Sequence, residues 1–381
     1  MARDRRGRTL PKGIRQRSSD YEGRFMYEGK TYTVHASTIT ETTRLMEETR
    51  RAVRRGEYIE KSPLTFKNYY NQWLEFHDMK AGTRDTYERI ASKWILPKIG
   101  KTRITNLTGA DFQAIYTSMV NAEKAKSSIE VCHAIVKGVM NSAVDDEIIR
   151  DNPVRRPKLP TKSGKAGKKL REKEHHAALT KEQQALFETY AAKSYLHNYF
   201  SILLRTGMRG GELLGLKWSD IDKGNKILHV KRTLKYLSGR GFFEDTPKSK
   251  SSIRDIPILP DVMQALEDQR NFWHFKITRI GTKNERYLFC NDQGGPLHPD
   301  ETRREMRAII EAIRAAGHDF PDVTPHTLRH TFATRAIESG MNPQVLKTIL
   351  GHSTLAMTMD LYSHVMPDTK AAEMEKIAVA F

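Results

Sequence analysis

The most informative stretch of this sequence is Thr324-Pro325-His326-Thr327-Leu328-Arg329-His330. Thr324 is a good N-cap residue and Pro325 suits the first helical position, so a helix is expected to begin here. His326 and Arg329 then lie three residues apart on one face of the first turn. An arginine beside a histidine at a helix start can bind an anion. The alternative is that one of the two caps the helix or pairs with a carboxylate.

Downstream, Asn342-Pro343 is expected to open a second helix, which Gly351 ends. His352 follows directly, and Tyr362 lies ten residues further along the chain. A lone tyrosine in such a place is more often a core or surface residue, so Tyr362 has to be judged together with its companions.

Upstream, residues 205–212 read Arg-Thr-Gly-Met-Arg-Gly-Gly-Glu, which predicts a tight turn between two helices. Arg209 is expected at the start of the second helix, where a phosphate fits, and Glu212 is placed one turn on to orient it. Two β-rich stretches follow, 227–233 and 252–258. A lysine on the loop between them can reach into a cleft.

In this order and spacing, the features resemble the tyrosine recombinases, also called phage-type integrases. The positions that match the family's catalytic set are Arg209, Lys248, His326, Arg329, His352 and Tyr362. Lys248 is preferred to Lys250 because the family pattern places the lysine nine residues before the proline that closes the next strand, here Pro257. The N-terminal part and the residues around Tyr362 resemble integrases of conjugative transposons and related phages.

The resemblance implies that Tyr362 attacks a DNA phosphorus and forms a 3′-phosphotyrosine bond, which frees a 5′ hydroxyl. A second 5′ hydroxyl then attacks this bond and rejoins the strands without ATP. The reaction needs positive charge at the phosphoryl oxygens, and Arg209 and Arg329 can each supply it as bidentate donors. By the same resemblance, His326 helps to move the tyrosine proton and His352 donates to the phosphate.

Lys248 is implied as the general acid for the leaving oxygen, with its pKa tuned by burial or a neighbouring cation. No carboxylate cluster suited to a metal is evident, and neither a metal nor a cofactor is expected. The implied partners are double-stranded DNA, at core and arm sites, and further copies of the chain in a homotetramer that works through a Holliday junction. An excisionase or a host DNA-bending protein is left open as a further partner. The tail 366–381 has apolar positions at helical spacing and, in this family, docks on the neighbouring protomer; packing on its own domain is the alternative.

The 381 residues carry a net charge of +18, which favours a polyanionic partner such as nucleic acid. A membrane surface or an acidic protein could use the same field. The two cysteines, Cys132 and Cys290, give neither a disulfide framework nor a Cys-rich zinc pattern. The basic start is not followed by an apolar stretch, and no apolar run has membrane-spanning length, so a cytoplasmic protein without a signal peptide is expected.

The predicted fold is multidomain and mainly α. Residues 1–60 are expected to form a small β-sheet plus a helix, with a strand at 13–17, a hairpin around Glu28-Gly29 and an arginine-rich helix from Thr40 to Gly56. An arm-type DNA-binding domain is favoured over a tail or a solvated basic helix.

Residues 63–153 are predicted to be a helical core-binding domain. One amphipathic helix is marked by an aromatic stripe, interpreted as core rather than as a base-stacking platform: Phe66, Tyr69, Tyr70, Trp73, Leu74 and Phe76. A second helix is expected from Thr83 to Ile95, stopped by Pro97. A third is expected after a capping box at Thr108, and a fourth over 127–145. Polar residues on the opposite faces are candidate DNA contacts: Lys80, Thr83, Arg84, Lys124 and Lys126.

Residues 154–174 are predicted to be a basic linker, because 155–174 holds nine Lys or Arg against two Glu, together with prolines and glycines. A tether along a phosphate backbone is favoured over a merely solvated linker. Residues 175–381 are expected to form an α+β catalytic domain of the tyrosine recombinase type, with its first helix opened by a capping box at Thr180.

Two other functions stay open at this point. A type IB topoisomerase uses almost the same residues to relax supercoils, but it needs neither a partner duplex nor an arm-binding unit. A DNA-binding regulator with an inactive catalytic domain is disfavoured because all six catalytic residue types are present.

Overall fold

The computed structural model describes residues 4–5, 7–55, 58, 62–158, 178–245, 253–280 and 287–365. The chain divides into two compact units, Met1–Lys173 and Glu174–Phe381, and each is described by itself. The predicted position of Lys248, most of the basic linker and the tail 366–381 lie outside the described residues.

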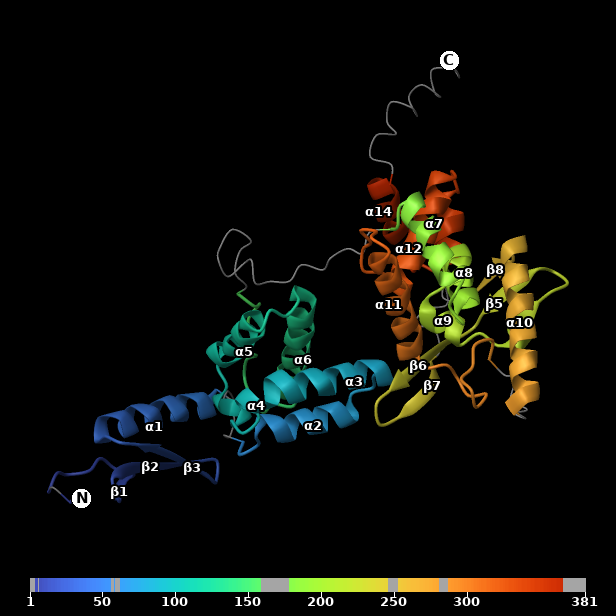
Figure 1. The fold of residues 1–381 in the computed structure, drawn as a ribbon. Coiled ribbons are helices and arrows are strands. Elements are labelled where there is room, and N and C mark those ends of the chain that lie inside the picture. The colour runs from blue at the N-terminus through green and yellow to red at the C-terminus, as the bar shows by residue number, and fades with distance from the viewer. Residues whose placement is uncertain are drawn as a thin grey trace, which may run out of the picture. The chain divides into compact units, whose positions relative to one another are not determined.

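The first unit begins with a three-stranded antiparallel sheet and one helix. The strands are β1 (Ile14–Arg17), β2 (Asp20–Tyr27) and β3 (Lys30–Ala36), in the order β1-β2-β3. The predicted hairpin is confirmed: Glu28 and Gly29 both have positive φ, as the two-residue turn between β2 and β3 requires. Helix α1 (Ile39–Arg54) packs on one face of the sheet, and the core between them is formed by Ile14, Tyr21, Phe25 and Met46 (Figure 1).

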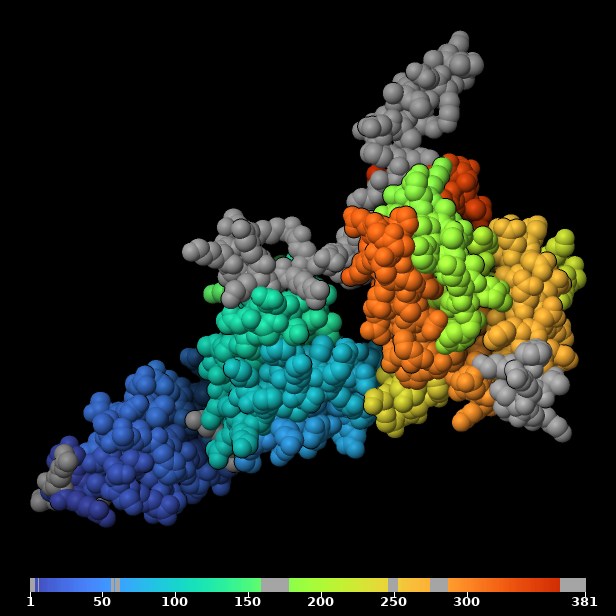
Figure 2. Space-filling view, in the orientation of Figure 1, coloured from blue at the N-terminus to red at the C-terminus, as the bar shows by residue number. Residues whose placement is uncertain are grey.

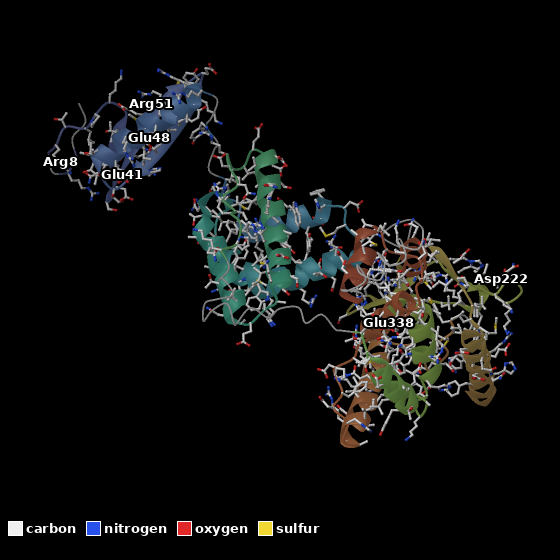
Figure 3. The ribbon with its side chains drawn as sticks, turned by 90° about the horizontal axis from the view of Figure 1, so that it is seen from above. Arg8, Glu41, Glu48, Arg51, Asp222 and Glu338 are labelled. Carbon is white, nitrogen blue, oxygen red and sulfur yellow. The ribbon has the colours of Figure 1, made fainter. Side chains whose placement is uncertain are left out.

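The other face of this sheet carries arginines around one buried carboxylate. Side chains alternate along a strand, so Arg15 and Arg17 of β1 share this face with Glu22 and Arg24 of β2. Glu22 has 1% of its side chain exposed and lies 2.9 Å from Arg15 and 3.5 Å from Arg17. The exposed charges of α1 pair along the helix instead, as Arg44 does with Glu48 and Arg51 with Glu47. Figure 3 labels Glu41, Glu48 and Arg51 on this helix.

The described residues from Phe66 to Asp145 are mainly helical, as predicted for 63–153. Their elements are α2 (Phe66–Phe76), α3 (Ala81–Ile90), a π-helical turn (Ala91–Ile95), α4 (Leu96–Ile99), a 3₁₀ turn (Ile104–Asn106), α5 (Gly109–Asn121) and α6 (Lys126–Asp145). The aromatic stripe is core, except that Phe76 is 86% exposed. Its position explains this, because 66, 69, 70, 73 and 74 follow the helical repeat and 76 does not.

The expectation that Pro97 stops a helix was wrong. The chain passes from α3 through the π-helical turn into α4, and Pro97 lies in the first turn of α4. The backbone N–H of Leu96 donates to the carbonyl of Ala91, five residues back, and this wider π-helical spacing directly before Pro97 accommodates the missing N–H of proline. The capping box at Thr108, which opens α5, is confirmed.

The second unit has eight α-helices among its described residues, besides a 3₁₀ turn (Trp218–Asp220). They are α7 (Lys181–Ala191), α8 (His197–Thr206), α9 (Gly210–Leu214), α10 (Pro260–Ile280), α11 (Pro299–Ala315), α12 (Pro325–Glu338), α13 (Pro343–Leu350) and α14 (Ala356–Val365). Helix α8 packs against both α10 and α12, and it supplies buried core residues such as Tyr199 and Phe200. Helix α11 lies beside α7, and Figure 2 shows both helices, α11 in orange and α7 in green, on the side of the unit that faces the viewer.

The strands of this unit form two small antiparallel sheets. The first contains β4 (Ile221–Asp222), β5 (Ile227–Val230) and β8 (Arg254–Pro257), and the second is the hairpin of β6 (Thr233–Leu237) and β7 (Gly241–Asp245). The β-rich stretch 227–233 contains one strand and the start of another, since β5 ends at Val230 and β6 begins at Thr233. The hairpin could have been recognised, because Gly239 and Gly241 lie between two runs rich in aromatic and β-branched residues. None of the helices in the described part of the chain is long and apolar enough to cross a membrane.

Candidate active site

Arg329 is held inward by the local structure that its sequence predicts. The Thr324 side chain accepts from the Thr327 N–H and Pro325 occupies the first turn, so α12 begins where expected. Arg329 follows one turn later and is 3% exposed. Its Nη1 donates to the carbonyl of Gly207 at 2.8 Å, and its Nη2 donates to the carbonyl of Leu350 at 2.7 Å.

Arg209 caps the N-terminus of α9, as predicted. Its Nη1 donates to Oε1 of Glu212 at 2.7 Å, and its backbone N–H donates to Oε2 of the same carboxylate at 2.9 Å. Its Nη2 reaches the carbonyl of Gly351 at 3.4 Å. Glu212 therefore orients Arg209, which is the role that the sequence suggested.

A third arginine joins the first two. Arg254, the first residue of β8, donates to both oxygens of Glu212, at 2.8 and 3.2 Å, and its Nε donates to the carbonyl of Ile349. The consecutive carbonyls of residues 349, 350 and 351 thus each accept a hydrogen bond from a different arginine. The last carbonyls of a helix have no intrahelical partner and carry the negative end of the helix dipole, so the end of α13 suits cations.

The end of α13 is shaped by Gly351, the predicted C-cap. Gly351 adopts a left-handed conformation with φ of 65° and turns the chain away from the helix axis. Gly207 plays the same part at the end of α8, with φ of 62°, and presents its carbonyl to Arg329. The C-terminal ends of α8 and α13 therefore both accept hydrogen bonds from the guanidinium of Arg329.

The cluster has more positive than negative charge. Three guanidiniums surround the single carboxylate of Glu212, which is 3% exposed. Burial, with the charge of Arg209 added, lowers the pKa of Arg329 to about 9. Burial alone would raise the pKa of Glu212, but its hydrogen bond to Arg254 and the charges of Arg254 and Arg209 lower it overall, so the carboxylate stays ionised.

His352 lies directly after the helix end that the arginines share, and it is 8% exposed. Burial and the positive charges of Arg329 and Arg209 lower its pKa to about 4, so the imidazole is neutral at pH 7. Its Nδ1 lies 3.0 Å from the hydroxyl oxygen of Thr358, which is fully buried on α14. When that hydroxyl donates to Nδ1, the remaining proton of the ring is on Nε2, and His352 becomes a neutral hydrogen-bond donor.

His326 lies on the first turn of α12, where its ring meets the ring of His330 edge to face at 4.5 Å. It also lines an open cleft of about 500 Å³ between β6 and the N-termini of α9, α11 and α12. The cationic residues of this cleft are largely compensated, because Lys235 pairs with Asp245 and Arg303 with Asp300. Among the described residues, no group of three or more His, Cys, Asp or Glu side chains is arranged to hold a metal ion.

Tyr362 lies on α14, and its hydroxyl donates a hydrogen bond to the carbonyl of Met341. The side chain packs with Phe332, Met341 and Leu361 beside the small core of α12 and α13, and burial raises its pKa. The structure therefore brings Arg209, Arg329 and His352 together, with His326 on the adjoining cleft. Tyr362 belongs to the same helical layer but has its hydroxyl engaged elsewhere.

Two residues of the cluster were missed in the sequence. Arg254 shares the inward side of β8 with Ile256, and a charge at an inward position of an alternating strand signals a buried partner. Thr358 had no such signal, because its contact with His352 depends on how α14 packs.

Comparison with known proteins gives concordant matches over the whole chain. The phage integrase family model matches residues 169–368, and the model of the SAM-like N-terminal domain of phage integrases matches residues 65–120. The transposase of transposon Tn916 from Enterococcus faecalis is 26% identical over 98% of this chain and 96% of its own length. The integrase of Mycobacterium phage L5 is 28% identical over 83% of this chain and 80% of its own. The Tn1549 transposon integrase, solved in complex with transposon right end DNA, superposes with a TM-score of 0.68 at 27% identity, covering 83% of this chain and all of that one.

Proposed function

This chain belongs to the phage integrase family, and on that basis we propose that it cleaves and rejoins DNA around the arginine cluster, with Tyr362 as the nucleophile. It is a tyrosine-type site-specific recombinase with a SAM-like domain and a catalytic domain. Its reaction is the integration and excision of a mobile element.

The observation that carries the assignment of the site is the excess charge beneath the end of α13. Among the described residues, three buried or half-buried arginines lie around the one carboxylate of Glu212, so the cluster carries an excess of positive charge. The transition state of phosphoryl transfer carries negative charge on its nonbridging oxygens. Preorganised donors stabilise such charge without having to reorganise during the reaction.

The remaining roles are assigned by the family resemblance, and for His352 the geometry supports the assignment. His352, neutral and fixed by Thr358, donates from Nε2 to a nonbridging oxygen. Tyr362 leaves the carbonyl of Met341, loses its proton with the help of His326 and attacks the phosphorus; the 5′ oxygen departs with a proton from Lys248. The phosphotyrosine bond forms as the P–O5′ bond breaks, so a later 5′ hydroxyl can reverse the step.

The outer regions are assigned to DNA as well. Residues 1–60 would read arm DNA through the arginine face of the β1–β3 sheet, since a sheet can enter the major groove. Residues 63–153 would hold the core site, with Lys80, Arg84 and Lys126 at the N-termini of α3 and α6 as phosphate contacts. Residues 154–174 connect them to the catalytic domain 175–381. Four copies would act together through a Holliday junction, with tails exchanged between protomers.

A trapping experiment tests the chemistry. The full chain is incubated with random-sequence duplexes that carry a nick. Cleavage near the nick releases a short fragment that diffuses away, so the strand cannot be rejoined and the covalent adduct survives detergent. The parent and Tyr195→Phe, a matched change of an exposed tyrosine, are expected to form adducts, whereas Tyr362→Phe forms none. Adducts with Tyr362→Phe would refute the nucleophile, and normal cleavage by Arg209→Lys would refute the role of Arg209.

The recovered DNA then separates a recombinase from a topoisomerase. Two separate duplexes that carry the recovered sequence should be joined to each other by the parent. Relaxation of supercoiled plasmid without such joining would favour the topoisomerase instead.

A further inference from the structure

Arg254 is the third arginine of the cluster, with 2% of its side chain exposed. One edge of its guanidinium faces both oxygens of Glu212, and its Nε donates to the carbonyl of Ile349. All three nitrogens of this guanidinium are engaged by Glu212 or Ile349, so any effect of Arg254 on the reaction is expected to act through the residues that it holds.

Two parts of the active site depend on these contacts. Glu212 is held by Arg254 and in turn holds Arg209, through its side chain at 2.7 Å and its backbone N–H at 2.9 Å. Ile349 belongs to the last turn of α13, which leads through Gly351 directly into His352. Arg254 therefore connects β8 to the arginine on one side of the site and to the histidine on the other.

The chemistry of arginine suits this bridge. The planar guanidinium can donate along one edge to a carboxylate and from Nε to a separate acceptor, whereas a lysine ammonium is a single point charge. Glu212 also supplies the counter-charge without which a buried cation would be unstable. The contact between β8 and α13 is thus polar and directional, which fixes the two elements at one spacing.

We propose that Arg254 is a positioning residue for DNA cleavage: by bridging Glu212 and the Ile349 carbonyl, it holds Arg209 and His352 at the spacing that one phosphate requires. The proposal rests on the function proposed above. It adds Arg254 to the active site as a residue that contacts no reacting atom but positions two residues that do, Arg209 and His352.

The test compares full-length Arg254→Met with the parent on two forms of one nicked duplex, which carries the core sequence recovered by trapping. One form has an ordinary phosphodiester at the cleavage position, and the other has a methylphosphonate. In the methylphosphonate a methyl group replaces one nonbridging oxygen, so the group is neutral and needs the guanidiniums far less. Cleavage of the phosphodiester is expected to fall on the order of 10²-fold, as misplaced catalytic groups cause, while cleavage of the methylphosphonate changes little.

Arg232→Met is the matched control. Arg232 also pairs with a buried carboxylate, Asp220, but lies outside the cluster. Its loss should lower stability without changing the ratio of the two cleavage rates. DNA binding, measured by mobility shift, should stay unchanged in both variants.

Several outcomes decide the matter. An equal loss on both substrates, or a ratio no different from that of Arg232→Met, would show that Arg254 only supports the fold and would overturn the proposal. Arg254→Lys keeps the charge without the fork, so it should restore only part of the phosphodiester rate, and full restoration would also overturn the proposal. If Arg254→Met does not fold, Arg254→Lys takes its place in the comparison. A parent that forms no adduct on either duplex would refute the proposed function rather than the role of Arg254.

Discussion

Replacing Gly207 with alanine is predicted to destabilise the catalytic unit. Gly207 has φ of 62°, and a methyl group added to it would lie 2.8 Å from Cε1 of Phe332 and 2.9 Å from Cδ2 of Leu350. A left-handed backbone costs a residue with a side chain about 1–2 kcal/mol. Overpacking of a core costs about 1–3 kcal/mol more. The free energy of unfolding should therefore fall by about 2–5 kcal/mol.

Two other glycines separate these causes. Gly239 has φ of 80° with nothing within 4 Å of an added methyl group, so Gly239→Ala should show the backbone cost alone, about 1–2 kcal/mol. Gly224 has neither strain nor crowding, since its closest neighbour is Oδ1 of Asp222 at 3.5 Å. Gly224→Ala should change stability by no more than about 0.5 kcal/mol.

The effect of Gly207→Ala should also reach the chemistry, because the carbonyl of Gly207 accepts from Arg329. A shift of a few tenths of an ångström there should slow cleavage on the order of tenfold at temperatures where the variant is folded. Urea unfolding of the full chain, with hydrogen exchange followed in peptides from α8 and α12, measures the stability of this unit. A loss no larger than that of Gly239→Ala would refute the packing argument, and unchanged cleavage would refute the link to Arg329.

Three further predictions concern other parts of the molecule. The pKa of His352 is about 4 in the folded protein, against an ordinary value of 6.5. The stability that the neutral imidazole contributes is therefore complete above pH 6.5 and is lost as the pH falls toward 4. The free energy of unfolding should fall by at most about 1.4 kcal/mol per pH unit in this window. His352→Gln should reduce this slope in urea unfolding, and an unaltered slope would contradict the assignment. Thr358→Val removes the hydroxyl that sets the tautomer of His352, so cleavage should slow on the order of tenfold with DNA binding intact; a normal rate would show that the hydroxyl is dispensable. Arg15→Ala and Arg24→Ala should each make the binding of DNA from the ends of the mobile element less dependent on salt. The slope of the logarithm of the binding constant against the logarithm of the salt concentration should become shallower by about 0.9 for each phosphate that the variant no longer neutralises. A slope equal to the parent's would exclude this face of the sheet as a DNA contact.

Local features of the fold could be predicted wherever a short stretch determines its own backbone. Glu28-Gly29 specifies a two-residue turn, Thr324-Pro325 specifies a helix start, and Gly351 specifies a helix end; all three are confirmed. Pro97 was misjudged because the same residue ends a helix or sits in its first turn, depending on what precedes it.

The site was harder to predict because its parts meet only through packing. Arg254 contacts a carbonyl 95 residues further along the chain, and the contact between Thr358 and His352 requires α14 to lie beside the end of α13. The order of catalytic residue types indicated the reaction, but it gave no information on which groups hold the others in place. It also gave no hint that the hydroxyl of Tyr362 would be bonded to a backbone carbonyl.

The hydrogen bond between Tyr362 and Met341 has a consequence for the chromosome of the host. A genome offers about 10⁶–10⁹ nonspecific sites, and a strongly basic protein visits many of them briefly. Because the hydroxyl proton is engaged by a neutral carbonyl, and burial raises the pKa of the phenol, the tyrosine is a poor nucleophile during such a visit. Breaks should therefore be confined to encounters that last long enough to free the hydroxyl, so that residence time protects the genome alongside sequence recognition.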